Sequence, residues 1–198
     1  MPTLLTDAPE IPLPLAPPRK RWTREQCAPL EASGLFEIEK LELVDGELIS
    51  KMGKNLPHSK ASPSFQRWLV RTFGWNRVNV EMAIDVSPAD NPTNEPQPDL
   101  IVLKRDLSTF DSNPRPEDLA LIIEIADSSL RFDLTVKAAL YARAGISDYW
   151  VFDISDKRLF VHRDPVSGRY SSVTVYGEDE AIAPLAAPDS PFRLSEAQ

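Results

Sequence analysis

Glu124 is the residue whose type and setting first point to chemistry. It lies inside the run LALIIEIA, where every other side chain is apolar. A run of this length and β-branched content is typical of a buried strand. A glutamate is almost never fully buried unless it is paired with a cation or coordinates a metal. The pattern indicates either a charged partner for Glu124 or a strand end that opens onto solvent, and both indicate a site.

Polar residues at helical spacing follow this strand. Asp133, Lys137 and Tyr141 stand at i, i+4 and i+8 of a segment that ends at Gly145, so they share one face of the expected helix. The sequence DYWVFD then predicts another strand. Such a strand, helix, strand unit is parallel and almost always right-handed, so Lys137 should return over the sheet near Glu124. Asp133 either orients this lysine or caps the helix, and Tyr141 is expected to pack or to donate a supporting hydrogen bond.

Two further strands must position a second acid, Asp99. The segment from Val78 to Val86 alternates apolar and other residues, which predicts a half-buried strand. A loop rich in proline and asparagine then leads into PDLIVL, and proline is tolerated at the first residue of a strand. Asp99 therefore stands at the beginning of a short apolar strand.

A β-hairpin is predicted over residues 41–50, LELVDGELIS. Asp45-Gly46 between two short runs is a strong turn signal. Glu42 and Glu47 lie at nearly symmetric positions about this turn. Periodicity alone favours two strand glutamates that face solvent.

The most basic stretch of the chain follows the hairpin and contains Lys51, Lys54, His58 and Lys60. It is either a lip that faces phosphate groups or a solvated loop, and the sequence favours neither. His58 by itself is more typical of a structural or exposed histidine than of a catalyst, because no Ser-His-Asp pattern surrounds it.

Two helices are expected before the first central strand. Thr23 and Gln26 fit a capping box that opens a short helix. The second helix is amphipathic, and its apolar stripe, which we assign to the core rather than to base stacking, consists of Phe65, Trp68, Leu69 and Phe73.

Composition sets the outer limits. The chain has 198 residues with 42% hydrophobic and 26% charged residues, as in an ordinary globular domain. A single cysteine, Cys27, excludes an internal disulfide framework and a cysteine metal cluster. We expect no membrane association, because no apolar stretch reaches about 20 residues, and the absence of a secretory signal makes the cytoplasm the default. The net charge of −8 disfavours a simple duplex binder, although a bound cation inverts the local charge.

The predicted organisation is a proline-rich arm over residues 1–20 and a single domain over residues 21–194. Two last strands are expected at 158–163 and 170–176, joined by a turn over 165–168. Three adjacent strands followed by a crossover predict an α/β fold with one mixed central sheet flanked by helices.

In this order the motifs resemble the PD-(D/E)XK nuclease superfamily, and within it the Uma-type restriction endonuclease family. The resemblance rests on LELVDGELI, on QPDLIVL, and on IIEIADSS followed by Asp133, Lys137, Tyr141 and GISDYWVFD. It covers residues 22–165 approximately. It implies the restriction-endonuclease-like fold, with the hairpin N-terminal to the sheet. The superfamily places Glu-x-Lys on the third strand, but here Ala126 follows, and the chain is similar to the Uma-type pattern in carrying its lysine on the next helix.

The resemblance implies a Mg²⁺-dependent endonuclease acting on DNA, with Mn²⁺ as a substitute. Asp99 and Glu124 would bind the metal, because Mg²⁺ needs only one or two protein carboxylates. Lys137 would position or deprotonate the attacking water and offset transition-state charge. Glu42 becomes the candidate for a further contact to metal or water. Lys51, Lys54 and His58 of the basic stretch stay possible phosphate contacts.

Alternative interpretations of the lysine and of the fold's function stay open. Lys137 could instead form a structural ion pair with Glu124 or Asp99, although such pairs are poor sources of stability. The same fold could serve as a non-cleaving module that binds nucleic acid or a partner, in a mobile-element or defence system. A hydrolase of another phosphate ester is a third class. A homodimer is expected by analogy with enzymes that cut both strands.

Overall fold

The computed structural model describes residues 19–51 and 56–197, and for residues 56–60, 196 and 197 it describes the backbone alone. Most of the predicted arm over residues 1–20 therefore lies outside the described residues, as does Lys54. The limits of the single domain at 21 and 194 stay a prediction.

A six-stranded mixed sheet forms the centre of the molecule, in the order β3-β4-β5-β6-β7-β8. Only β5 and β6 pair in parallel, and all other neighbours are antiparallel. This confirms the predicted meander followed by a crossover. The strands are β3 (Val78–Val80), β4 (Leu100–Leu103), β5 (Leu119–Ala126), β6 (Asp148–Asp153), β7 (Arg158–Val166) and β8 (Arg169–Tyr176).

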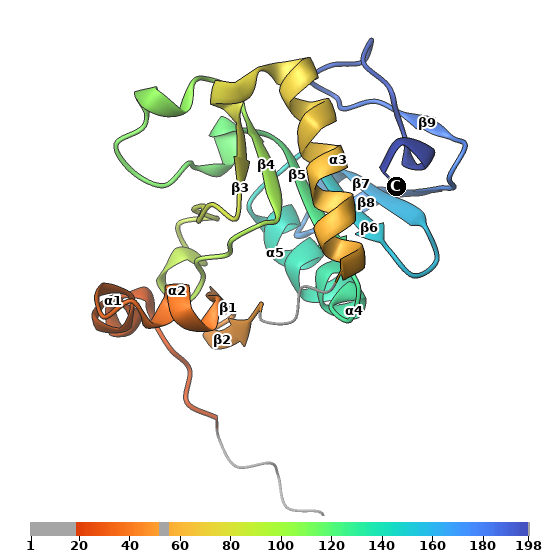
Figure 1. Ribbon diagram of the computed structural model, residues 1–198. Coiled ribbons are helices and arrows are strands. Elements are labelled where there is room, and N and C mark those ends of the chain that lie inside the picture. The colour runs from red at the N-terminus through yellow and green to blue at the C-terminus, as the bar shows by residue number, and fades with distance from the viewer. Residues whose placement is uncertain (1–18, 52–55, 198) are drawn as a thin grey trace, which may run out of the picture.

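Helices cover both faces of the sheet (Figure 1). One face packs against α3 (Leu56–Phe73), whose Phe65, Leu69 and Phe73 enter the core as predicted. The other face packs against the crossover, which consists of α4 (Leu130–Phe132), a π-helical turn (Asp133–Lys137) and α5 (Ala138–Arg143).

Strand β5 is buried along its whole length, which explains its unbroken apolar sequence. Leu121, Ile123 and Ile125 pack on the α3 side, and Ile122 and Ala126 pack on the crossover side. Successive side chains alternate between the two faces of a sheet. Glu124 therefore faces the crossover helix.

The N-terminal part lies beside one end of the sheet (Figure 1). A capping box at Thr23 opens α1 (Arg24–Ala32), as predicted, and a short α2 (Leu35–Glu39) follows. The predicted hairpin is confirmed as β1 (Leu41–Val44) and β2 (Glu47–Ser50). An isolated bridge between Leu43 and Glu95 ties this hairpin to the loop before β4.

Two predicted strand limits are wrong. The strand expected to reach Val86 ends at Val80, because Glu81 has a φ of +51° and turns the chain out of the ladder. The last turn is tighter than expected. Pro165 pairs with Tyr170 inside the β7–β8 ladder, so the turn contains only Ser167 and Gly168, both with positive φ.

The remaining elements are short. A two-stranded sheet of β9 (Ala181–Ile182) and β10 (Phe192–Arg193) adds Ile182 and Phe192 to the α3-side core. Single 3₁₀ turns occupy Trp75–Arg77, Asn91–Thr93, Leu107–Thr109, Pro116–Asp118 and Leu194–Ala197.

Candidate active site

Two of the predicted acids, Asp99 and Glu124, lie on neighbouring strands and are tied together by main-chain hydrogen bonds. The N–H of Asp99 donates to Glu124 Oε2 at 3.3 Å. The N–H of Ile125 donates to Asp99 Oδ2 at 2.8 Å. Both side chains are buried. The antiparallel β4–β5 pair thus fixes the two carboxylates beside each other, as the order of strands predicts.

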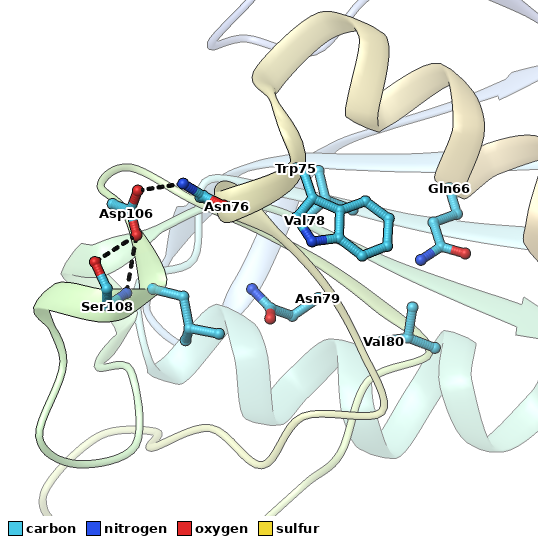
Figure 2. A pocket seen from close by; sticks show the side chains of 9 residues that line it. Gln66, Trp75, Asn76, Val78, Asn79, Val80, Asp106 and Ser108 are labelled. Atoms are coloured by element: carbon cyan, nitrogen blue, oxygen red, sulfur yellow. Dashed lines mark hydrogen bonds between the residues drawn. The ribbon is translucent and has the colours of Figure 1, made fainter.

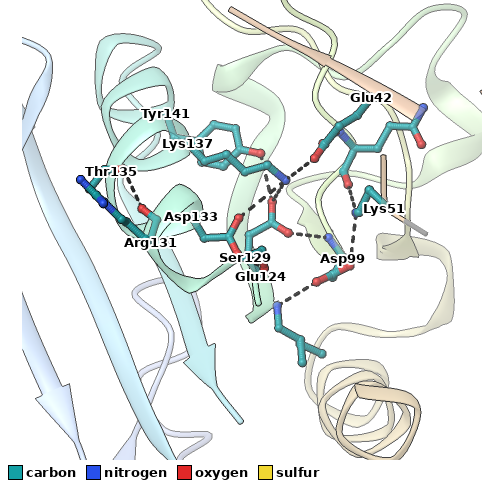
Figure 3. A network of polar contacts seen from close by, with 12 residues as sticks. Glu42, Lys51, Asp99, Glu124, Ser129, Arg131, Asp133, Thr135, Lys137 and Tyr141 are labelled. Carbon is teal, nitrogen blue, oxygen red and sulfur yellow. Dashed lines mark hydrogen bonds and ion pairs between the residues drawn. The ribbon is translucent and has the colours of Figure 1, made fainter. Parts of the chain in front are cut away.

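The ammonium of Lys137 lies between two carboxylates (Figure 3). Its Nζ is 2.9 Å from Glu124 Oε1 and 2.9 Å from Glu42 Oε1. Asp133 Oδ1 lies 4.0 Å away, and Lys137 itself is 1% exposed. The predicted return of this lysine over the strand that holds Glu124 is therefore observed.

A π-helical turn carries this lysine. The turn spans Asp133–Lys137, and the N–H of Ala138 bonds to the carbonyl of Asp133, five residues earlier. Both Asp133 and Lys137 are buried within it. Single π turns inside α-helices occur frequently at functional sites. Sequence spacing predicted the shared face but gave no signal of this widened turn.

Glu42 is 2% exposed, so the interpretation of this residue as a solvent-facing strand glutamate is wrong, whereas Glu47 is exposed as expected. Strand β1 is sandwiched, with Leu43 packed against α1 and α2 and Val44 packed against the main sheet. Glu42 enters the site, and its Oε2 accepts a hydrogen bond from the N–H of Gln97 at 3.0 Å. The docking of the hairpin against the sheet, a tertiary contact, decides its burial.

Lys51 supplies a second ammonium. Its Nζ lies 3.2 Å from Asp99 Oδ1 and also donates to the carbonyl of Gln97. The sequence predicted Lys51, Lys54 and His58 together as phosphate contacts. The structure pairs Lys51 with Asp99, and its contact to phosphate stays a prediction. Lys54 lies outside the described residues, and the side chain of His58, on α3, is likewise not described. The sequence signal that could have placed Lys51 beside the acids is its position directly after β2 of the hairpin.

Two hydroxyl groups donate hydrogen bonds to acids of this cluster. The hydroxyl of Tyr141 donates to Glu124 Oε1 at 3.3 Å, and its ring packs edge-on against Tyr149. The hydroxyl of Ser129 donates to Asp133 Oδ2 at 2.7 Å. Asp133 faces Lys137 rather than only capping the helix, so the structure favours the first of its two predicted roles.

Among the described side chains, the cluster contains more negative than positive charge. Burial raises the pKa of Glu124 to about 8, although Lys137 opposes the rise, and burial raises the pKa of Asp133 to about 6. Burial alone would lower the pKa of Lys137, but Glu124, Glu42 and Asp133 outweigh it and hold that pKa well above its usual value. The ammonium is therefore charged, and Glu124 holds a proton at neutral pH unless another cation compensates it.

The donor set fits a hard divalent cation. Asp99 and Glu124 supply carboxylate oxygens in a cluster where, counting only side chains that the structure describes, four acids (with Glu42 and Asp133) exceed two ammonium groups. In the part of the chain that the structure describes, no three His, Cys, Asp or Glu side chains group as a metal site. Mg²⁺ does not require three, because it keeps several waters and needs only one or two carboxylates.

A mixed six-stranded sheet flanked by helices, with a hairpin N-terminal to it, is the architecture of the restriction-endonuclease-like fold. The chain belongs to the Uma2 family, described as "Putative restriction endonuclease", whose model matches residues 25–194. Fold and family both support a nuclease, as the sequence motifs predicted.

Known structures support the fold. The chain is similar to the crystal structure of "a putative nuclease belonging to DUF820" from Anabaena variabilis ATCC 29413, with a TM-score of 0.62 and 17% identity. The likeness covers 79% of this chain and 88% of that chain, and at this identity it shows the fold alone. No curated protein matches the chain. Within the described residues, no helix has both the length and the apolar character to cross a membrane.

Proposed function

We propose that the protein is a divalent-metal-dependent endonuclease that hydrolyses phosphodiester bonds in DNA. The observation that carries the proposal is the buried Lys137 ammonium, 2.9 Å from Glu124 and from Glu42, in a cluster that also contains Asp99. Burying so many charges is a poor way to gain stability, which favours a functional reason for keeping them.

In this proposal Asp99 and Glu124 hold Mg²⁺, for which Mn²⁺ substitutes. When bound, the cation neutralises charge on the phosphate oxygens and promotes ionisation of water. Glu124, whose pKa burial has raised to about 8, would release its proton to solvent before it could hold such a cation. The hydrogen bonds from the N–H groups of Asp99 and Ile125 keep the two carboxylates in place.

The chain's own residues orient the water and balance charge. Lys137 has a raised pKa, so it acts as a fixed cation that donates hydrogen bonds to the attacking water and offsets negative charge in the transition state. Glu42 and Asp133 hold its ammonium in position. The hydroxyl of Tyr141 donates a further hydrogen bond to Glu124 Oε1, the oxygen that Lys137 also contacts, and so helps to orient this carboxylate.

Cleavage of supercoiled plasmid DNA with Mg²⁺ or Mn²⁺, and with EDTA as the metal-free control, tests the proposal. Asp99→Asn, Glu124→Gln and Lys137→Met should each abolish metal-dependent cleavage. Lys157→Met, at an exposed ion pair with Glu178, is the matched control and should cut as the wild type does. Full cleavage by Lys137→Met would show that its assigned role is wrong.

One observation favours a second candidate, a non-cleaving module that binds nucleic acid or a partner. The acids of the cluster already have cationic contacts, Asp99 with Lys51 and Glu124 with Lys137. The strand also lacks the superfamily lysine at Ala126. Calorimetric titration with Mn²⁺ separates the two candidates, since a folded protein without Mn²⁺ affinity supports the module.

A further inference from the structure

A cavity of about 490 Å³ lies along the free edge of β3 and has no role in the proposed chemistry (Figure 2). Trp75, Asn79 and Val80 line it, with Gln66 of α3 and Leu107 of the next loop. Trp75 is 71% exposed, which is unusual for the largest apolar side chain. A flat aromatic surface beside a cavity is characteristic of a binding site rather than of core packing.

Asn79 provides the polar group of this cavity. Its Nδ2 is buried and has no hydrogen-bond partner among the described residues. A buried donor without an acceptor costs about 1–3 kcal/mol, so such groups in native structures call for an explanation. Asp106, which also lines the cavity, is by contrast fully engaged by Asn76 and Ser108. The donor without a partner is thus Asn79, which lines the same cavity as Trp75.

The cavity and the candidate active site share the β3–β4 strand pair. Asn79 pairs with Ile101 on β4, two residues from Asp99, and the N–H of Glu81 donates to the carbonyl of Asp99 at 3.3 Å. Trp75 lies further along, before Val78, whose partner Val102 is three residues from Asp99, so the indole is more than about 10 Å of strand away from that acid. A nucleic-acid strand bound at Asp99 would therefore reach the cavity with a base about three or more nucleotides away.

Cations for a phosphate backbone lie on the adjoining helix. Arg67 and Arg71 are exposed on α3, close in sequence to Gln66. Neither guanidinium has an ion-pair or hydrogen-bond partner among the described residues, whereas Arg24, Arg143 and Arg163 are paired with carboxylates. A pair of uncompensated arginines is notable in a chain with a net charge of −8.

We propose that this cavity binds one unpaired base of a nucleic-acid strand, stacked on Trp75 and hydrogen-bonded by Asn79. A nucleobase has both a π face for the indole and ring or carbonyl acceptors for Nδ2. An added peptide strand fits less well, because β3 has three residues and the left-handed Glu81 ends it. The inference rests on the proposed function in that the bound strand is the nuclease substrate.

The test is fluorescence anisotropy of labelled single-stranded oligonucleotides in EDTA, where no cleavage occurs. Trp75→Ala should weaken binding about tenfold or more, because stacking of one base contributes that much. Trp75→Phe should retain most of the affinity, since it keeps an aromatic face. Asn79→Ala should reduce discrimination between oligo(dA) and oligo(dT). Arms with DNA and RNA of one sequence identify the strand type.

Ile38→Ala is the matched control, because Ile38 is also 71% exposed but lies on α2. It should bind as the wild type does, and a blunt duplex should be bound equally by wild type and Trp75→Ala. The inference is overturned if Trp75→Ala binds single strands as tightly as Ile38→Ala, if it loses duplex binding equally, or if the wild type binds no single strand. If Trp75→Ala loses single-strand binding but the wild type cleaves no DNA, the nuclease proposal is refuted and the base site stands. If the wild type cleaves DNA but Trp75→Ala binds single strands normally, the base site is refuted and the nuclease proposal stands.

Discussion

Replacing Lys137 by methionine removes the ammonium of the buried cluster but keeps an unbranched side chain. Its Nζ lies 2.9 Å from Glu124 and from Glu42, and 4.0 Å from Asp133. Removing one partner of a buried ion pair costs about 3–5 kcal/mol, because the remaining charge stays buried without compensation. We expect Lys137→Met to lower the free energy of unfolding by about that amount, a large share of the roughly 5–15 kcal/mol of a typical domain.

The loss of stability expected for Lys137→Met depends on pH. Burial raises the pKa of Glu124 to about 8 and that of Asp133 to about 6, and Lys137 lowers both. Without the ammonium both pKa values rise further. The folded state then binds these two protons more tightly than the unfolded chain, so stability falls as the pH rises from about 4 to beyond about 8. The difference from wild type should be smallest near pH ~5, where both acids stay protonated in both proteins. It should be larger near pH ~8 and should keep growing above that pH, because the wild type ionises these acids at lower pH than the variant does.

Urea denaturation followed by tryptophan fluorescence measures this loss. With a slope of about 2 kcal/mol per molar urea, the midpoint should fall by roughly 2 M near pH ~8. Lys157→Met is the control, because its pair with Glu178 is 50% and 40% exposed. Exposed pairs contribute at most about 1 kcal/mol. The reasoning is refuted if both variants shift the midpoint equally, or if the Lys137→Met shift is the same at both pH values.

Three further expectations follow from the same cluster. Calorimetry should show Mn²⁺ affinity rising about tenfold per pH unit up to the Glu124 pKa of about 8 and levelling above it, because the proton must leave first; affinity independent of pH would contradict this. Glu42→Gln should slow plasmid cleavage about 10²-fold, because Lys137 loses a 2.9 Å partner, and an unchanged rate would remove Glu42 from the site. Tyr141→Phe should cost about 1 kcal/mol in urea denaturation, because one hydrogen bond to Glu124 is lost, and should change cleavage less than tenfold; a larger rate loss would assign Tyr141 a direct role.

Local sequence patterns predicted the contact between Lys137 and Glu124. The apolar run around Glu124 identified a buried strand, and helical spacing with right-handed connectivity brought Lys137 back over it. Asp99 could be placed because a short apolar strand begins immediately after it. These inferences use periods and connections that the chain carries within about 40 residues.

Features decided by packing between distant segments could not be predicted. Glu42 has the alternation of an exposed strand residue, but the docked hairpin buries it. The sequence left Lys51 open between a phosphate-facing lip and a solvated loop, and its contact with Asp99 depends on how the hairpin docks. The strand after Val78 alternates to Val86, yet the left-handed conformation at Glu81 ends its pairing, and alternation carries no signal of such a φ.

A crystal structure of the protein with Mn²⁺, phased on the anomalous signal of the ion, tests the central claim most directly. Our account predicts an anomalous peak within bonding distance of carboxylate oxygens of both Asp99 and Glu124, about 2.0–2.3 Å for such ions, with Lys137 still beside Glu124. An anomalous map without a peak at these two acids, with their contacts to Lys51 and Lys137 unchanged, would contradict it.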